Sequence, residues 1–178
     1  MKLTIGICIC GLLLTGCATP YQSHGYTGGY SETRLAENVF QVTFKANAYS
    51  GFERATDFNL LRSAELTLEN GFRYFIIVDS KEHTTESTYT APTTSQTTAS
   101  AYGYGNAAYG HAQTTTYGGQ TYHYSKPSTT NDIVCFKEKP DIVGMVLDAV
   151  YVTDSIRKKY GIAAPAPEFE ANRSELRK

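Results

Sequence analysis

The sequence between residues 84 and 131 limits most strongly what this chain can fold into. Thr, Ser, Gly, Tyr, Ala and Gln dominate there, aliphatic side chains larger than Ala are missing, and only Glu86 and Lys126 carry formal charge. Such a stretch buries too little apolar surface to offset the entropy of ordering it. The other segments must therefore form one core of roughly 100 residues. We expect residues 84–131 to be a low-complexity insertion, either a long hairpin or a disordered loop, between two core strands.

The beginning of the chain has the layout of a leader peptide. Met1-Lys2 gives a positive start, residues 3–14 are almost wholly apolar, and the run closes with Leu14-Thr15-Gly16-Cys17. This predicts a signal peptide over residues 1–16, too short and wrongly flanked for a transmembrane helix. Its end is similar to a lipobox, in which cleavage after the small Gly16 makes Cys17 the first residue. Cys17 would then carry an N-acyl and an S-diacylglyceryl group.

The predicted lipid anchor indicates where the mature chain resides. Two or three acyl chains anchor a protein durably, since each buried methylene contributes about 0.8 kcal/mol. Residue 18 is Ala rather than Asp. In a host with two membranes, the sorting pattern of lipoproteins then implies the periplasmic face of the outer membrane. Residues 17–31 contain several Gly, Tyr and Ser residues, and we interpret them as a lipidated, flexible tether.

The cysteines follow from the same interpretation. Cys8 and Cys10 leave with the leader and Cys17 is acylated, so the mature chain keeps only Cys135. No internal disulfide is then possible, even in an oxidising compartment. Cys135 lies in an apolar, strand-like run without an evident activating partner. We therefore expect a buried thiol rather than a nucleophile.

The segments outside the insertion predict an α+β domain over residues 32–162. Residues 39–46 alternate as in a strand, with Phe40, Val42 and Phe44 toward the core. Residues 51–70 have helical spacing, with a capping box formed by Ser50 and Glu53.

Gly71 supplies the left-handed position that ends this helix. Residues 72–78 are apolar at nearly every position, which is typical of a central strand covered on both faces. Residues 132–137 predict a strand that pairs with residues 72–78. Residues 146–160 predict a second helix that ends at Gly161, and residues 163–178 an exposed tail. The expected fold is a small sheet of three or more strands with two helices packed on it.

Three phrases of the sequence together resemble a known family. They are GGYSETRL at residues 28–35, DFNLLRSAELTLENGF at residues 57–72 followed by Tyr74-Phe75, and KYGI at residues 159–162. The chain is similar, from Cys17 to Ile162 apart from the Thr/Tyr-rich stretch, to a family of small uncharacterised proteobacterial lipoproteins. The resemblance implies lipoprotein status and a Gram-negative host. It brings no assigned activity, so it implies no functional residues.

A few polar and aromatic residues are candidates for interaction. Glu32 and Arg34 alternate along one phrase, so they could share a strand face and accept a partner's charged groups. They could equally pair with Arg54, Arg62 or Glu65 and fix the N-terminal segment to the first helix. Arg62 and Glu65 are expected to form an ordinary helix-surface ion pair. In the insertion, Tyr122 and Tyr124 are candidate contact residues through strand addition or aromatic stacking.

Motifs for catalysis, cofactors and metals are not evident. His24, His83, His111 and His123 form no metal-ligand spacing with Cys or carboxylates. Neither a nucleophile elbow nor a phosphate-binding glycine loop occurs. The net charge of −1 and the lack of a long Lys/Arg block disfavour nucleic-acid binding. We therefore predict no catalytic, cofactor-binding or metal-binding residues.

The sequence thus favours a non-enzymatic accessory or structural role in the cell envelope. The expected partners are the membrane, through the lipid anchor, and another envelope protein. One alternative is a small-molecule or lipid-binding module with a pocket between sheet and helices. Another is an enzyme of unknown type that uses Glu32 and Arg34.

Overall fold

A computed structural model describes residues 18–163, and it divides them into two units. The first unit contains residues 18–85 and 125–163, and the second is Glu86–Tyr124. The fold is α+β, as predicted. Its elements are, in chain order, β1 (Gly29–Ala36), β2 (Val39–Lys45), α1 (Phe52–Glu69), β3 (Tyr74–Thr90), β4 (Thr94–Tyr104), β5 (Ala107–Tyr117), β6 (Thr121–Phe136), β7 (Leu147–Asp148) and α2 (Ala149–Tyr160).

The first unit is built on a five-stranded sheet of order β1-β2-β6-β3-β7. The pairs β1–β2, β2–β6 and β3–β7 are antiparallel. The predicted pairing of the two apolar runs is confirmed, because β3 and β6 are neighbours and the Arg73 amide donates to the Phe136 carbonyl.

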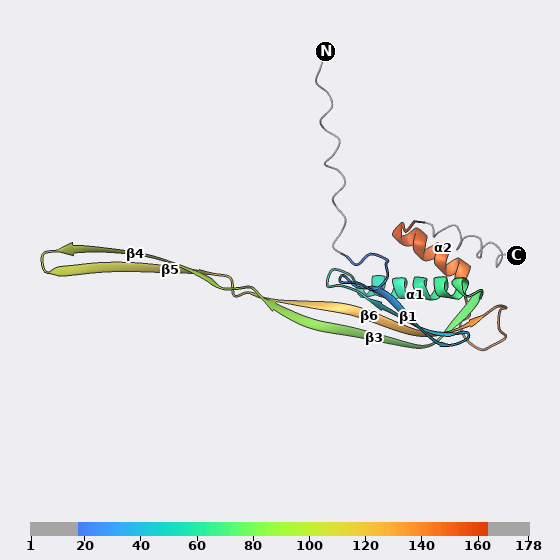
Figure 1. Ribbon diagram of the computed structural model, residues 1–178. Coiled ribbons are helices and arrows are strands. Elements are labelled where there is room, and N and C mark those ends of the chain that lie inside the picture. Colours follow the sequence, from blue (N-terminus) through green and yellow to red (C-terminus); the bar gives the residue numbers. More distant parts are fainter. Residues whose placement is uncertain (1–17, 164–178) are drawn as a thin grey trace, which may run out of the picture. The chain divides into compact units, whose positions relative to one another are not determined.

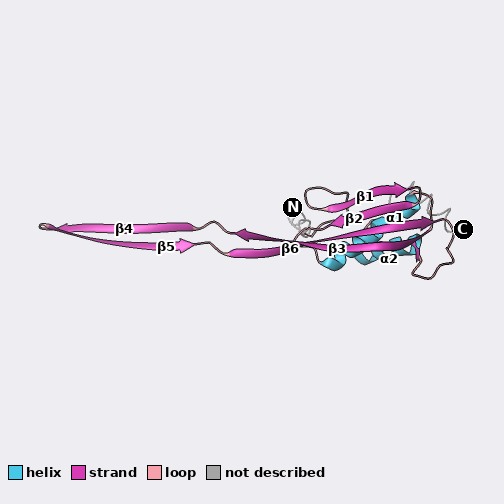
Figure 2. Cartoon of the chain, turned by 90° about the horizontal axis from the view of Figure 1, so that it is seen from below, coloured by secondary structure: helices cyan, strands magenta, loops and turns pink. Residues whose placement is uncertain are grey.

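Both helices cover the same face of this sheet (Figure 1), and the strands lie in front of them when the sheet is seen from the other side (Figure 2). The predicted inward face of β2 is confirmed, since Phe40, Val42 and Phe44 are all buried. Residues 72–78, however, are not covered on both faces. Val78 is 56% exposed, because the helices protect one side of the sheet only.

Helix α1 begins and ends close to its predicted limits, but its first turn is not capped as expected. Gly51 is the N-cap and no side chain caps the helix. The Ser50 hydroxyl is engaged elsewhere: it accepts from the Thr19 amide and donates to Asn47. At the other end, the predicted role of Gly71 is confirmed by its φ of +76°. Its amide and that of Phe72 bond back into the last helical turn, as in a Schellman motif.

Helix α2 starts later than predicted. The sequence interpretation placed its first residue at 146, but residues 147–148 pair as β7 with β3. Asp148 then caps the helix by accepting from the amides of Val150 and Tyr151. Gly161 ends α2 with φ of +63°, as predicted.

The predicted boundaries of the insertion need correction at its C-terminal side. Residues 128–131 belong to the core sheet, where they pair with β2. Thr129 and Asn131 are buried there, and the Thr129 hydroxyl donates to the Ala55 carbonyl of α1. The sequence pattern missed them because they are polar residues in a Thr/Ser-rich context. The rest of the stretch contains β4 and β5, joined by the two-residue turn Gly105-Asn106.

The predicted tether is wrong for residues 19–31, because this segment packs onto the first unit. Thr19 is fully buried, its amide donates to Ser50, and its hydroxyl accepts from the Asn47 amide. Isolated bridges join Ser23 to Tyr30 and Gly25 to Gly28, and β1 begins at Gly29. The Gly- and Tyr-rich residues 19–31 thus form a folded turn rather than a flexible linker.

Two predictions concern residues outside the described range. Gly16 and Cys17, with the rest of the predicted leader, precede residue 18, and all of the predicted tail except Ala163 follows the range. Between residues 18 and 163, no helix is long and apolar enough to cross a membrane.

Candidate functional site

The most elaborate polar cluster of the first unit is centred on Glu65 of α1. This carboxylate is 4% exposed and is bonded by Tyr21 and by Arg157 of α2, whose Nε lies 3.0 Å from Glu65 Oε1. Burial and the negative charge of Glu65 raise the pKa of the Tyr21 phenol well above its ordinary value. The cluster therefore joins the N-terminal segment, α1 and α2 through one buried carboxylate.

Arg62, one turn earlier on α1, extends the cluster to β1. Its Nη2 lies 2.9 Å from Glu32 Oε1, and its Nη1 lies 2.8 Å from Glu69 Oε1. Its guanidinium also stacks over the Tyr30 ring at 4.7 Å from the centroid. Burial alone would lower the pKa of Arg62, but the bonds to Glu32 and Glu69 raise it above the ordinary value. Arg62 is thus a fixed cation.

The structure decides between the two interpretations of Glu32 and Arg34. Glu32 pairs with Arg62, as the structural alternative anticipated. Arg34 lies on the same sheet face, but its guanidinium bonds to the carbonyls of Ala36 and Glu37 and stacks over Phe40. The two residues thus do not form a joint site.

The expectation of an exposed Arg62–Glu65 pair is wrong. The two groups are 3.7 Å apart, but both side chains are at most 10% exposed and belong to a larger network. A signal was present in the sequence: Glu65 falls on the apolar stripe of α1 with Leu61 and Leu68, where a charge has to find a buried partner. The partners Tyr21 and Arg157 could not be identified, because they come from distant parts of the chain.

A second ion cluster joins the first two turns of α1 to the last turn of α2. Lys159 Nζ lies 2.5 Å from Glu53 Oε1 and 2.6 Å from Asp57 Oδ2. The Tyr160 hydroxyl also donates to Asp57. Hydrogen bonds to Asp57 and Glu53 raise the pKa of Lys159, although burial acts in the opposite direction. This cluster fixes the antiparallel packing of the two helices.

Polar side chains also line the contact between α1 and the sheet. The fully buried Asn59 donates to the carbonyls of Val42 and Thr129, at 3.2 and 2.8 Å, and so bridges β2 and β6. Further along α1, the Thr67 hydroxyl lies 3.4 Å from Cys135 Sγ. Cys135 is free and 1% exposed, which confirms the predicted buried thiol. Burial raises its pKa, so the reactive thiolate is disfavoured.

These clusters consist of groups that satisfy one another. Each buried carboxylate and guanidinium is bonded within the fold, an arrangement that fixes side chains rather than presenting them to a substrate. In the described residues, no group of three or more His, Cys, Asp or Glu side chains is placed to hold a metal ion. The polar side chains of the first unit thus mainly connect its helices and strands to one another.

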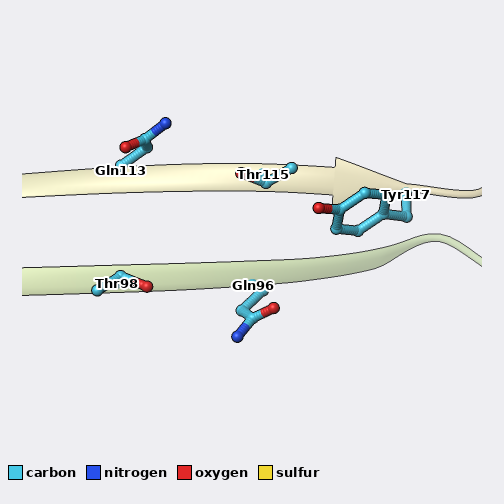
Figure 3. Close-up of a pocket in the computed structure, with 5 residues that line it drawn as sticks. All are labelled: Gln96, Thr98, Gln113, Thr115 and Tyr117. Atoms are coloured by element: carbon cyan, nitrogen blue, oxygen red, sulfur yellow. The ribbon is translucent and has the colours of Figure 1, made fainter.

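The second unit offers a different kind of surface. The register of β4 with β5 sorts its side chains onto two faces. One face carries large polar and aromatic groups, among them Tyr102 stacked on Tyr109 with centroids 5.9 Å apart. A shallow hollow on this face is lined by Gln96, Thr98, Gln113, Thr115 and Tyr117 (Figure 3).

The opposite face of this hairpin holds small side chains only. They are Ser95, Thr97, Ala99, Ala101 and Gly103 of β4, opposite Thr116, Thr114, Ala112, Gly110 and Ala108 of β5. The Thr97 and Thr114 hydroxyls bond across the strands at 2.8 Å. We call this the small-residue face; its side chains are all exposed.

The two predicted contact tyrosines lie on β6, at its end within the second unit. Tyr122 is 53% exposed, stacks on Tyr89 at 6.5 Å between centroids, and donates to Gln120. Tyr124 is partly buried. The structure therefore leaves Tyr122 accessible.

Comparison of the chain with protein-family models, with curated proteins and with solved structures gives no match. The resemblance to a lipoprotein family therefore stays a prediction.

Proposed function

We propose that this protein is an acylated lipoprotein of the cell envelope, held through Cys17 on the periplasmic face of the outer membrane. Its role is non-enzymatic: it contacts another envelope protein. The observation that carries the anchor is the sequence Leu14-Thr15-Gly16-Cys17 behind an uncharged apolar run. The hairpin β4–β5 is the proposed contact surface.

Three properties of the hairpin support an interaction role. Within residues 18–163, β4 and β5 pair only with each other, so each has an outer edge without a strand partner there. Residues 87–125 contain no Asp, Glu, Lys or Arg, whereas exposed edges are usually protected by charged side chains, bulges or proline. An isolated two-stranded hairpin is also marginally stable in water. A partner strand added to either edge would supply main-chain hydrogen bonds and stabilise it.

The anchor is tested by the mass of the N-terminal peptide and by fractionation. We expect a peptide that starts at Cys17 and carries acyl groups, and we expect the Cys17→Ser variant to leave the membrane fraction. An unmodified Cys17 in membrane-derived protein would refute the anchor.

The hairpin is tested by cross-linking in intact cells, followed by mass spectrometry of the captured proteins. The test variant replaces residues 86–124 by a short glycine-containing turn. We expect it to lose the partner while remaining in the membrane fraction. Capture of the same partners by both proteins would refute the role of the hairpin.

A matched pair of variants tells which face the partner covers. Ala99→Lys with Ala112→Glu puts two opposite charges on directly opposed positions of the small-residue face. Ser100→Lys with His111→Glu does the same at the next pair of positions, on the other face. Loss of partner capture by the first variant alone would place the partner on the small-residue face.

A further inference from the structure

The folded N-terminal segment has a consequence for how the proposed lipid anchor is attached. Thr19 is fully buried, with its amide bonded to Ser50 and its carbonyl to Arg54. Only Ala18 separates it from Cys17 in the sequence. Two residues span at most about 7 Å, so an acyl group on Cys17 would enter a bilayer within a short reach of this buried position. A flexible 13-residue linker would instead have a mean span of about 20 Å.

Three exposed aromatic residues, Tyr26, Tyr49 and Phe52, lie next to the segments that bond to Thr19. Tyr26 is fully exposed, Tyr49 is 75% exposed and Phe52 is 37% exposed. Tyr26 precedes Thr27, whose carbonyl accepts from the Thr19 hydroxyl. Tyr49 precedes Ser50, which binds the Thr19 amide. Hydrogen bonds to Thr19 therefore hold both loops next to this buried residue.

Two charged residues near these segments, Glu53 and Lys45, do not oppose a lipid surface. Glu53, the exposed carboxylate that follows Phe52, is neutralised by Lys159 at 2.5 Å. Lys45 is exposed. Its carbonyl packs directly against Gly28, where an added side chain would clash with it, so Lys45 borders the turn at residues 25–28. Tyr is enriched at membrane–water interfaces, where its ring contacts the acyl boundary and its hydroxyl stays hydrated.

We propose that this end of the first unit, residues 19–28 and 46–52, rests directly on the lipid surface, with Tyr26, Tyr49 and Phe52 at the level of the headgroups. The inference rests on the proposed acylation of Cys17 and goes beyond it. The anchor and the aromatic side chains together fix the orientation of the first unit on the membrane. The domain is therefore not suspended on a linker.

The absence of Trp from the chain makes this orientation measurable. Single Tyr26→Trp and Tyr49→Trp variants of the full-length, acylated protein are reconstituted into vesicles that contain lipids with brominated acyl chains. The matched control is Tyr151→Trp: Tyr151 is 74% exposed and lies in the first turn of α2. The clusters of Lys159 and Tyr160 at the other end of α2 are about 12 Å away along the helix.

We expect bromolipids to reduce the emission of the two test variants at least about twofold, because interfacial groups lie about 5–10 Å into the boundary region. The Tyr151→Trp control should keep its emission. A water-soluble quencher should instead reduce the emission of the Tyr151→Trp control more than that of the two test variants. Because all three side chains are exposed, these substitutions leave the core unchanged, and circular dichroism checks this.

The possible failures are distinguishable. If Cys17 carries no acyl groups and the protein does not stay on the vesicles, the proposed function is refuted and the inference fails with it. If the protein is acylated and retained, but the Tyr26→Trp and Tyr49→Trp variants are quenched no more than the control, the inference alone is overturned.

Discussion

Replacing Glu65 by Gln should destabilise the first unit strongly, although the shape of the side chain is kept. The Glu65 carboxylate is 4% exposed and neutralises Arg157, whose side chain is 13% exposed. Arg62 keeps Glu32 and Glu69 after the substitution, but within residues 18–163 the Arg157 guanidinium keeps only its bond to the carbonyl of Ala163. The loss of stability therefore comes mainly from the Arg157 guanidinium, which stays buried without a compensating negative charge.

Removing one partner of a buried ion pair typically costs about 3–5 kcal/mol. We expect about 3 kcal/mol for Glu65→Gln, since the amide still accepts one hydrogen bond. In a domain of this size, such a loss lowers the melting temperature by more than about 10 °C. Urea unfolding of the chain that begins at Cys17, followed by circular dichroism, measures the free energy of unfolding.

The matched control is Asp79→Asn, which removes an ion pair of similar length in solvent. Asp79 and Lys81 are 2.9 Å apart, with side chains 50% and 69% exposed. We expect an unchanged urea midpoint, because water screens this pair. A double variant, Glu65→Leu with Arg157→Met, should be less destabilised than the sum of the two single changes. A loss below about 1 kcal/mol for Glu65→Gln would refute the buried-network argument.

Three further predictions test the contacts that hold the N-terminal segment and the core. Burial and the adjacent carboxylate raise the pKa of Tyr21 above its ordinary 10.0. The unfolded chain therefore releases this proton first, and the stability, full below pH 10, falls above it by up to about 1.4 kcal/mol per pH unit. Urea unfolding between pH 9 and 11 measures how the free energy of unfolding changes with pH. Tyr21→Phe should remove the part of this change that comes from Tyr21, and equal slopes for the variant and the wild type would contradict the raised pKa. Gly29 has a φ of +127°, and a side chain there would lie 2.6 Å from the Ser23 carbonyl oxygen. Gly29→Ala should therefore release the N-terminal segment to limited proteolysis, whereas Gly51→Ala, which meets no atom within 4 Å, should not. Asn59→Ala should cost about 2–4 kcal/mol, because it removes the bridge between two strands and leaves a cavity; a midpoint equal to wild type in urea unfolding would show that the bridge contributes nothing.

The sequence predicted the elements whose patterns are local. The alternation of β2 gave its buried face, and glycines with left-handed geometry marked both helix ends correctly at Gly71 and Gly161. It missed the fold of residues 19–31, since small and polar side chains there are ordered by hydrogen bonds to residues about 30 positions away, Asn47 and Ser50. No local periodicity reports such contacts.

The candidate sites show the same division. Glu32 and Arg34 share a face, as alternation requires, but the bonds to Arg62 and to backbone carbonyls decide what each of them does. The buried state of Glu65 follows from its place on the apolar stripe of α1. Its partners do not, because Tyr21 and Arg157 are separated from it by 44 and 92 residues.

The sequence by itself determined the α+β class, because composition and periodicity report it. From spacing and residue identity it also predicts the anchor at Cys17 and a single remaining thiol at Cys135. Only the tertiary structure decided that Thr19 is buried, that Glu65 is the centre of an ion network, and that one face of the β4–β5 hairpin carries small side chains only. Burial and register arise when distant segments meet, so the free energy that fixes them is spread over contacts that no local pattern encodes.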